Sequence, residues 1–308
     1  MGYNVTKMEN VFALDIGGSK IVLALVSPEG KILRIEKEEL PPFYGVEVVK
    51  KTIRKLHHLF PNENVSSIGS TVPALADHKK GIWLYSPFNK IRDFPLGDFL
   101  TEEFSVPSFV DNDVNACAIG EKRFGACQKE DDFLWVTVSN GIGGALFLKG
   151  ELYRGKNGNA GEIGHMRMDF SSDAPFCGCG HQGCLEATSS GRGISARYAT
   201  LTGKQLKANE IASLARQGEE KAKEAVAYSA TLLGRAISYV VNLLNLPLVI
   251  LGGGVSQSFD LLKPYLLKEI RQGVWQEATP QVVLKTTSLG YYAATVGAAT
   301  LALEGIKK

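Results

Sequence analysis

The chain has 308 residues, of which 44% are hydrophobic and 21% charged, and its formal net charge at pH 7 is +2. This composition is typical of a globular protein of about two domains. The nearly balanced charge provides no basic surface for nucleic acid and no single-sign surface for a membrane. No stretch is apolar over the roughly 18 residues that a membrane span needs, and the polar start is unlike a secretory signal. We therefore expect a cytoplasmic protein that binds neither nucleic acid nor membranes.

The first half of the chain alternates between strand-like and helical segments. Apolar residues predict strands at 11–15 and 20–26, joined by the glycine turn 16–19, and a third strand at 32–36. Apolar positions at helical spacing predict a helix over 45–60, which Pro61 ends. Three further strands are expected in this half, at residues 65–72, 82–85 and 107–110, and one further helix at residues 94–104.

The second half repeats the opening layout. A strand at 133–138, a glycine turn at 139–144 and a strand at 145–148 match the arrangement of residues 11–26. The simplest explanation is an internal duplication, with two lobes that each open on a glycine-turned hairpin. A long helix over 224–246 and a buried strand at 248–251 follow, so strands and helices alternate throughout. This alternation predicts an α/β protein.

Three of the five cysteines, Cys177, Cys179 and Cys184, lie within eight positions. Thiolates this close favour a soft metal ion, and zinc requires four ligands in a tetrahedron. The fourth ligand is either His165, twelve residues upstream, or His181 inside the loop. The alternative is a disulfide with spare thiols, against which the odd cysteine count and the absence of a secretory segment both argue.

Two glycine turns have the character of phosphate-binding loops. Asp15 ends a strand immediately before Gly17 and Gly18, and residues 139–144 form the matching turn of the second half. Glycines let backbone amides approach a phosphate closely, and a neighbouring carboxylate can hold Mg²⁺ through water. Either turn alone could be an ordinary hairpin turn, but two together suit a polyphosphate. A third glycine turn, at residues 252–254, follows a buried strand and could admit a flat ligand or simply lead into a helix.

Polar residues Asp111, Asn112 and Asp113 follow the strand-like segment 107–110. A carboxylate at the end of a buried strand can accept a hydroxyl proton, and an adjacent amide can bind a second hydroxyl. The alternative is that these residues cap the N-terminus of a helix, because residues 116–121 have helical character.

Taken in order, these motifs resemble the ROK family of sugar kinases, whose members share the two-lobed actin/hexokinase-type (ribonuclease H-like) fold with a duplicated core. The resemblance covers nearly the whole chain. Residues 15–20 match the first phosphate loop, and residues 112–121 match the catalytic segment. Residues 158–186 match the family signature with its zinc loop, and residues 251–254 match the adenosine motif. We expect a smaller lobe of residues 1–113 and about 288–308, and a larger lobe of residues 114–287 that carries the zinc loop.

The resemblance implies ATP- and Mg²⁺-dependent phosphorylation of a hexose at its 6-hydroxyl, with glucose or a related sugar as substrate and a homodimeric assembly. Asp113 would be the catalytic base. The residues expected to contact the sugar are Asn112, Asp113, Glu162, His165 and Glu186. The residues expected to hold a structural zinc ion are His165, Cys177, Cys179 and Cys184. The residues expected to contact ATP are Asp15, Gly17, Gly18, Ser19, Lys20, Asn140, Gly141, Gly143, Gly253 and Gly254.

The chain departs from the family pattern at three places. Ser139-Asn140-Gly141 replaces the usual Gly-Thr-Gly, Ser19 replaces a threonine, and Val72-Pro73-Ala74 stands where many relatives have glycines around the proline. The family also contains sugar-responsive repressors, which carry a helix-turn-helix module ahead of the first phosphate loop. The ten residues before Val11 are too few for such a module, which favours the kinase. A sugar-binding protein without catalytic activity is a third alternative, to which the Ser139-Asn140 departure points.

Overall fold

The computed structural model describes residues 9–86 and 91–307, and its internal contacts divide the chain into two units. Unit 1 contains the described residues up to Lys129 and those from Tyr292 onward, and unit 2 is Glu130–Tyr291. The sequence expectation began the larger lobe at residue 114. In the structure, helix α3 (Asp113–Phe124) belongs to unit 1, because it packs against the C-terminal helix α9 (Ala293–Gly305).

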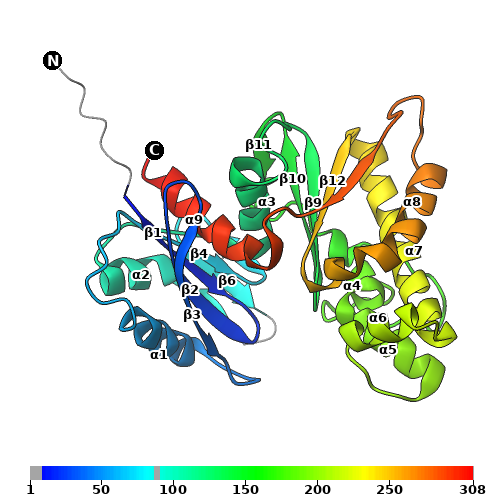
Figure 1. Ribbon diagram of the computed structural model, residues 1–308, viewed down its shortest axis with the longest axis horizontal. Coiled ribbons are helices and arrows are strands. Elements are labelled where there is room, and N and C mark those ends of the chain that lie inside the picture. Colours follow the sequence, from blue (N-terminus) through cyan, green and yellow to red (C-terminus); the bar gives the residue numbers. More distant parts are fainter. Residues whose placement is uncertain (1–8, 87–90, 308) are drawn as a thin grey trace. The chain divides into compact units, whose positions relative to one another are not determined.

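Unit 1 is built on a five-stranded sheet in the order β3-β2-β1-β4-β8 (Figure 1). The glycine turn joins β1 to β2 as an antiparallel hairpin, β3 continues the antiparallel side, and β4 and β8 run parallel to β1. The strand bounds are Val11–Ile16 for β1, Lys20–Val26 for β2, Ile32–Glu39 for β3, Ile68–Val72 for β4 and Ser108–Asn112 for β8.

Both faces of this sheet are covered, which explains the nearly continuous apolar run of β1. Phe12 and Leu14 pack into the core that includes α1 (Val46–His57) and α2 (Leu96–Phe104), while Val11 and Ala13 face α9. Helix α9 lies very close to the sheet, since a Cβ atom on Gly69 would meet the Ala298 carbonyl oxygen at 1.8 Å. A small antiparallel sheet completes the unit, with strands β5, β6 and β7 at Leu75–Asp77, Ile82–Ser86 and Ile91–Phe94.

Unit 2 repeats this topology. Its sheet has the order β11-β10-β9-β12-β13, again with an antiparallel hairpin at the centre and two parallel strands beyond it. The bounds are Phe133–Val138 for β9, Ile142–Leu148 for β10, Glu151–Tyr153 for β11, Leu248–Gly252 for β12 and Val283–Thr286 for β13. The same order and directions in both units agree with the duplicated core predicted from the sequence. The glycine turn is shorter than expected, because β10 begins at Ile142.

The helices of unit 2 pack around the 25-residue helix α7, which starts at Glu220, four residues before its predicted start. Helices α5, α6 and α8 all contact α7, and their apolar side chains form one core with β9 and β12. The helix bounds are Leu185–Ser189 for α4, Gly191–Thr202 for α5, Ala208–Arg216 for α6, Glu220–Leu244 for α7 and Phe259–Gly273 for α8, with short 3₁₀ segments η1, η2 and η3 at Ile163–His165, Gly254–Ser258 and Gly290–Tyr292.

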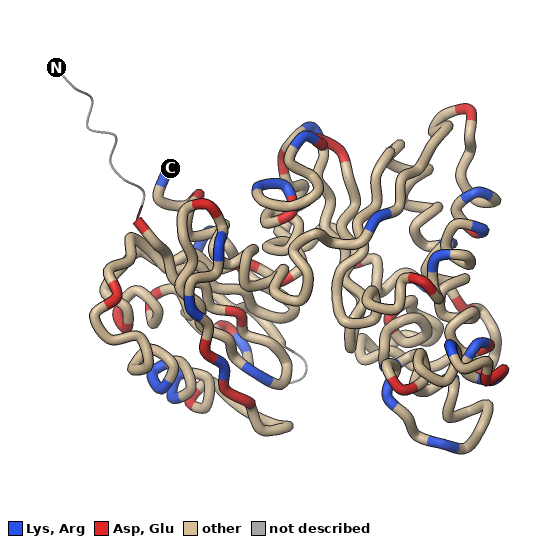
Figure 2. Tube along the Cα trace, in the orientation of Figure 1, with Lys and Arg blue, Asp and Glu red and all other residues tan. Residues whose placement is uncertain are grey.

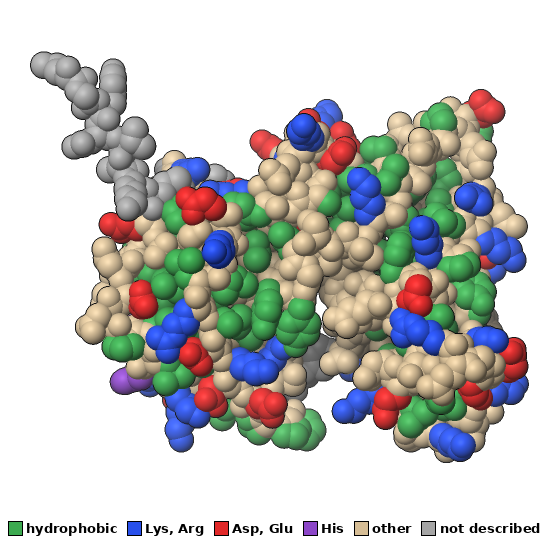
Figure 3. All heavy atoms as spheres, in the orientation of Figure 1, with side chains coloured by type: hydrophobic (Ala, Val, Ile, Leu, Met, Phe, Trp, Pro, Cys, Tyr) green, Lys and Arg blue, Asp and Glu red, His purple; other side chains and the backbone are tan. Residues whose placement is uncertain are grey.

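Basic and acidic residues are interspersed along the chain of each unit (Figure 2). On the face drawn in Figure 3, basic and acidic groups alternate with hydrophobic patches, and no large area carries one sign of charge. Among the described residues, no helix has the length and apolar character needed to cross a bilayer.

Candidate functional site

In unit 1, three polar side chains meet where parallel strands end. The strand register pairs Asp15 of β1 with Thr71 of β4, and Thr71 with Asp111 of β8. The Thr71 hydroxyl donates a hydrogen bond of 2.9 Å to Asp15 Oδ1. The carboxyl edge of parallel strands is where ligands bind in α/β sheets, so this edge is the candidate site of unit 1.

The first glycine turn is braced from its own chain. The Gly17 amide donates to the Lys20 carbonyl oxygen at 2.9 Å, and the Tyr44 hydroxyl donates to the Gly17 carbonyl oxygen at 2.9 Å. Gly18 and Ser19, at the tip of the turn, are exposed. Burial raises the pKa of Asp15, while the Thr71 hydrogen bond and the Lys20 charge oppose this rise. The arrangement presents an exposed backbone turn beside a partly desolvated carboxylate.

Asn112 caps helix α3, as the capping alternative predicts. Its Oδ1 accepts hydrogen bonds from the backbone amides of Val114 at 2.9 Å and Asn115 at 3.1 Å. Its Nδ2 donates to the Ala74 carbonyl oxygen at 2.7 Å and to Asp113 Oδ1 at 3.1 Å. An amide side chain has two donor hydrogens and two acceptor lone pairs, so these four bonds use its full capacity. A sugar hydroxyl would therefore have to share or displace one of them.

The Asp113 carboxylate is oriented by its surroundings. Its Oδ1 accepts from the Asn112 side chain and, at 3.0 Å, from the Val114 backbone amide at the first turn of α3. Cys117 lies one turn further along and is buried. Desolvation, with the charges of Asp113, Asp15 and Glu121, raises the pKa of the Cys117 thiol well above its usual range. The fold thus brings Asp15 and Asp113, almost 100 positions apart in sequence, around the same buried thiol.

The segment that departs from the family's glycines is held in a strained conformation. Ala74 has a φ of 64°, in the left-handed region that favours glycine. Its carbonyl oxygen accepts from Asn112, and the preceding Pro73 carbonyl oxygen accepts from Trp83 Nε1 at 3.1 Å. Contacts on both sides therefore keep this turn in place despite its alanine.

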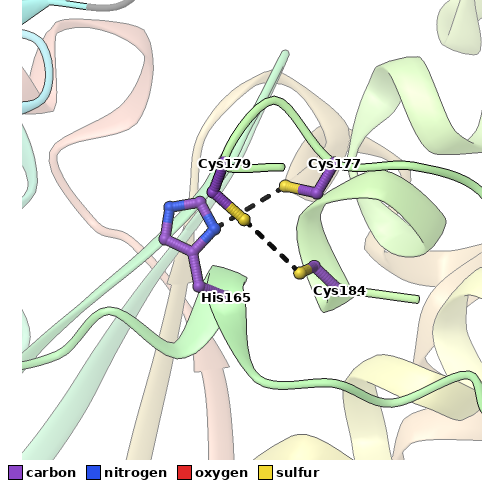
Figure 4. Close-up of side chains that lie close together, drawn as sticks. All are labelled: His165, Cys177, Cys179 and Cys184. Carbon is purple, nitrogen blue, oxygen red and sulfur yellow. Dashed lines mark hydrogen bonds between the residues drawn. The ribbon is translucent and has the colours of Figure 1, made fainter. Parts of the chain in front are cut away.

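In unit 2, the ligand atoms of His165, Cys177, Cys179 and Cys184 lie within 4.8 Å of one another (Figure 4). Two chain segments bring them together. His165 ends η1, and Cys184 directly precedes α4, with the Leu185 amide donating to the Met166 carbonyl oxygen at 2.8 Å. His181 is not part of this group of four, although its Nδ1 lies 3.5 Å from Cys179 Sγ.

The spacing of these four atoms fits a zinc ion. Zinc–sulfur bonds of about 2.3 Å at tetrahedral angles place two sulfurs about 3.8 Å apart, and a sulfur and a nitrogen about 3.5 Å apart. The Cys179 and Cys184 sulfurs are 3.7 Å apart, and Cys177 Sγ is 3.6 Å from His165 Nδ1. A single sulfur–nitrogen distance does not distinguish the two histidines considered from the sequence, but only the His165 nitrogen is grouped with all three sulfurs, which favours His165.

The three thiols ionise unequally. Desolvation opposes ionisation of Cys179, but hydrogen bonds from the amide and side chain of His181 and from the other two thiols outweigh it and lower the pKa of Cys179 to about 6. Desolvation and the hydrogen bond with Cys179 raise the pKa of Cys184 to about 12. Of these two thiols, Cys179 is therefore the one that ionises more readily.

Two carboxylates flank the cluster. His165 directs its other ring nitrogen, Nε2, toward Glu162, whose Oε2 is 3.8 Å away. Burial raises the pKa of Glu162; the His165 charge opposes this rise and the nearby Glu186 charge adds to it. Glu186, in the first turn of α4, accepts the Ile142 backbone amide at 3.1 Å through Oε2. The three residues expected to bind sugar in this half of the chain therefore lie together at the group formed by His165 and the three cysteines.

The second glycine turn lies against the same carboxylate. A Cβ atom on Gly141 would be 2.4 Å from Glu186 Oε2, so any larger residue there would require the Glu186 side chain to move. Asn140 is exposed at the tip of this turn, whereas Gly143 is inside β10 and paired with Thr137. The turn proper thus contains two of the three residues expected from the sequence to contact ATP in this segment.

The third glycine turn packs beside the second. Gly253 has a φ of 84°, and a Cβ atom on it would lie 2.4 Å from the Val138 carbonyl oxygen, directly before the second turn. Gly254 begins η2, and the Ser256 hydroxyl donates to the Gly253 carbonyl oxygen at 2.7 Å. Both turns expected to contact ATP in unit 2 are therefore neighbours in the fold.

A model of the ROK family matches residues 11–305. The chain belongs to the ROK family. The α/β fold expected from the sequence is confirmed by ROK structures. A ROK family glucokinase from Streptomyces griseus, solved in complex with glucose and AMPPNP, is 31% identical with a TM-score of 0.85, and the match covers 96% of this chain and 100% of that one.

Two kinds of ROK protein match at similar identity. A glucokinase of Halalkalibacterium halodurans is 32% identical over 312 residues, covering 92% of each chain. A xylose repressor of Bacillus subtilis is 29% identical over 297 residues, covering 94% of this chain and 76% of the repressor. The relatives that match this chain therefore include both a glucokinase and a repressor.

Proposed function

We propose that the protein is an ATP-dependent sugar kinase that phosphorylates a hexose, glucose or a related sugar, at its 6-hydroxyl. The observation that carries this proposal is the Asp113 carboxylate at the start of α3. Two donors orient its Oδ1, and it shares the Cys117 environment with Asp15 at the carboxyl edge of the sheet. An oriented carboxylate beside a phosphate-type turn is the arrangement that a proton acceptor in phosphoryl transfer requires.

In the proposed reaction, Asp113 accepts the proton of the sugar 6-hydroxyl as that oxygen attacks the γ-phosphorus of ATP. The new O–P bond forms while the bond from the γ-phosphorus to the bridging oxygen breaks, and ADP leaves. Phosphoryl transfer requires mainly positioning, Mg²⁺ and a proton acceptor. Glu162, His165 and Glu186 are proposed to hydrogen-bond sugar hydroxyls, together with Asn112 once it yields one of its present bonds.

The proposed nucleotide contacts are the three glycine turns, through their exposed backbone amides, and Asp15, through Mg²⁺-bound water. The metal ion would neutralise charge on the phosphates when bound. The zinc ion is proposed to be structural, because four protein ligands leave no open coordination position. A cytoplasmic location fits this proposal, since the reduced thiols and ATP that it requires are found there.

The first test is an ADP-release assay over a panel of glucose, N-acetylmannosamine, N-acetylglucosamine, allose and fructose. We expect turnover with at least one of these sugars, and glucose is the default substrate. Binding of a sugar without turnover on any member of the panel would overturn the kinase proposal in favour of a non-catalytic sugar-binding protein.

The second candidate function is a sugar-responsive regulator, favoured by the similarity to the xylose repressor. It predicts sugar-dependent retention of promoter DNA by the full-length protein in a filter-binding assay. Turnover in the panel together with no retention of DNA would exclude it.

A homodimer, the assembly expected from the family resemblance, is checked by light scattering during size-exclusion chromatography.

Replacing Asp15 by Asn separates stability from activity. Because burial raises the pKa of Asp15, its ionised form destabilises the fold at neutral pH, and this cost disappears as the pH falls toward the unperturbed value of 3.8. Asn can accept the same Thr71 hydrogen bond without a charge. We therefore expect Asp15→Asn to raise Tm at pH 7 relative to wild type, by a difference that shrinks in acid, and to lower kcat at least about 100-fold through loss of the Mg²⁺ contact. A lower Tm at pH 7 would contradict this account.

A further inference from the structure

The start of helix α5 holds two successive carbonyl groups of the second glycine turn. The Gly191 backbone amide donates to the Ser139 carbonyl oxygen at 2.7 Å. Arg192 Nε donates to the next carbonyl oxygen, that of Asn140, also at 2.7 Å. Neither contact follows from the sequence pattern, because an arginine at the start of a helix has no recognisable function by itself.

Arg192 also faces the carboxylate of Glu186, which accepts the backbone amide that follows the turn. Its terminal nitrogen is 3.6 Å from Glu186 Oε1, while Glu186 Oε2 accepts the Ile142 amide. The Arg192 side chain is 53% exposed and that of Glu186 is 17% exposed. An ion pair that is half in solvent contributes little to global stability, so its importance lies in the geometry that it imposes.

That geometry fixes the direction of two backbone donors. A trans peptide is planar, and its carbonyl and N–H groups point in opposite directions. Holding the Ser139 and Asn140 carbonyls against α5 therefore turns the amides of Asn140 and Gly141 away from α5. Within the part of the chain that the structure describes, no hydrogen bond uses either of these two amides as a donor. Consecutive N–H groups that point the same way form an anion-binding concavity.

We propose that Arg192 is a positioning residue for the nucleotide phosphates. It holds the Asn140 carbonyl so that the Gly141 amide faces the phosphate, and Glu186 secures the same turn through the Ile142 amide that follows it. This role rests on the proposed kinase function. It also accounts for a turn that has Ser139-Asn140 in place of Gly-Thr: a side chain from α5 supplies the restraint on the turn.

The test measures binding of Mg²⁺-AMPPNP, a non-hydrolysable ATP analogue, by calorimetry to wild type, Arg192→Met and Arg192→Lys. Methionine keeps an apolar stem but has no donor, so we expect the Kd to rise about tenfold. Lysine is a single flexible donor that can hold the Asn140 carbonyl without the fixed fork, so it should restore part of the affinity. In the kinase assay, Arg192→Met should raise the KM for ATP about tenfold while kcat changes less than about threefold, a split that a reduced folded fraction would not produce.

Arg235→Met is the matched control. Arg235 is 49% exposed and also makes a 2.7 Å contact through Nε, but to Glu269 on α8. The Arg235→Met variant should bind Mg²⁺-AMPPNP with the same Kd as wild type. If Arg192→Met binds Mg²⁺-AMPPNP with wild-type affinity, the inference is wrong. If Arg192→Met fails to fold, the inference is wrong when Arg192→Lys binds Mg²⁺-AMPPNP as tightly as wild type or more tightly. The binding measurement is independent of turnover: a wild type that binds Mg²⁺-AMPPNP but phosphorylates no sugar overturns the kinase and leaves Arg192 to be judged by its Kd. A wild type that does not bind Mg²⁺-AMPPNP overturns both.

Discussion

Under the proposed mechanism, we expect Asp113→Asn to lower kcat by about 10²–10⁴-fold, the range that general bases contribute, without weakening the fold. The asparagine side-chain oxygen can still accept from the Val114 amide, as Asp113 Oδ1 does at 3.0 Å, so the first turn of α3 keeps its hydrogen bond. What is lost is the proton acceptor for the sugar hydroxyl. Single-turnover kinetics with the best sugar of the panel measures this loss directly, and calorimetry should show that sugar binding persists.

Asp98→Asn is the control for this substitution. Asp98 also lies in the first turn of a unit 1 helix, α2, but it is exposed and is not part of the carboxyl edge of the sheet. It should retain wild-type kcat and Tm. If Asp113→Asn kept a kcat within about threefold of wild type, another group would be receiving the proton, and the proposed mechanism would be wrong.

The sequence is informative about the sheets because the strands of both units have simple apolar patterns. Residues 11–26 and 133–148 both have a strand, a glycine turn and a strand, and this similarity predicted the repeated sheet that the topology shows. The turn length was less predictable. Gly143 and Gly144 look like turn residues, yet both are paired with β9 inside β10. At Gly144 the glycine reflects packing, because a Cβ atom there would lie 2.8 Å from the Gly161 carbonyl oxygen.

Helix α9 shows why other elements escape sequence analysis. Its segment Ala293–Gly305 is apolar on nearly all sides, with Ala298, Ala299, Ala302 and Leu303 buried against the sheet. A helix covered by β1, β4 and α3 has no polar face, so the periodicity that identifies an amphipathic helix is absent. Helix α4 is hidden because it has only five residues, and the start of α5 is hidden because Gly191 and Gly193 have the appearance of a loop.

The residue types of the candidate site were predictable from the sequence, but the contacts that its side chains make were not. Asn112 is both a helix cap and a candidate sugar ligand, and only the four hydrogen bonds of its side chain show how fully the cap occupies it. Thr71 and Arg192 were missed, because a hydroxyl at a strand end and a basic residue at a helix start are common everywhere. Their importance comes from Asp15 and Asn140, which are 56 and 52 positions away in the chain.

Removal of the metal ion should have the second large effect. The proposed zinc ion joins the segment that ends at His165, just after Glu162, to Cys184, which directly precedes the helix that carries Glu186. Without it, three neighbouring thiols and an imidazole lose the bonds that hold the loop closed. We expect His165→Ala or Cys184→Ser to lower the stability of unit 2 by about 5 kcal/mol, roughly 10–20 °C in Tm, and to abolish sugar binding. Elemental analysis should find about one zinc per wild-type chain and little in either variant.

His181→Ala separates the metal ligand from its neighbour in the loop. His181 Nδ1 lies 3.5 Å from Cys179 Sγ, as close as a ligand would be, but His181 is outside the group of four. Its substitution should leave zinc content, Tm and sugar affinity close to wild type. Zinc lost from His181→Ala and kept by His165→Ala would instead make His181 the fourth ligand and free both nitrogens of His165 for the sugar. A wild type that contains no zinc and is indifferent to chelation would show that the cluster is only a group of thiols, and that Glu162 and Glu186 are held by the protein alone.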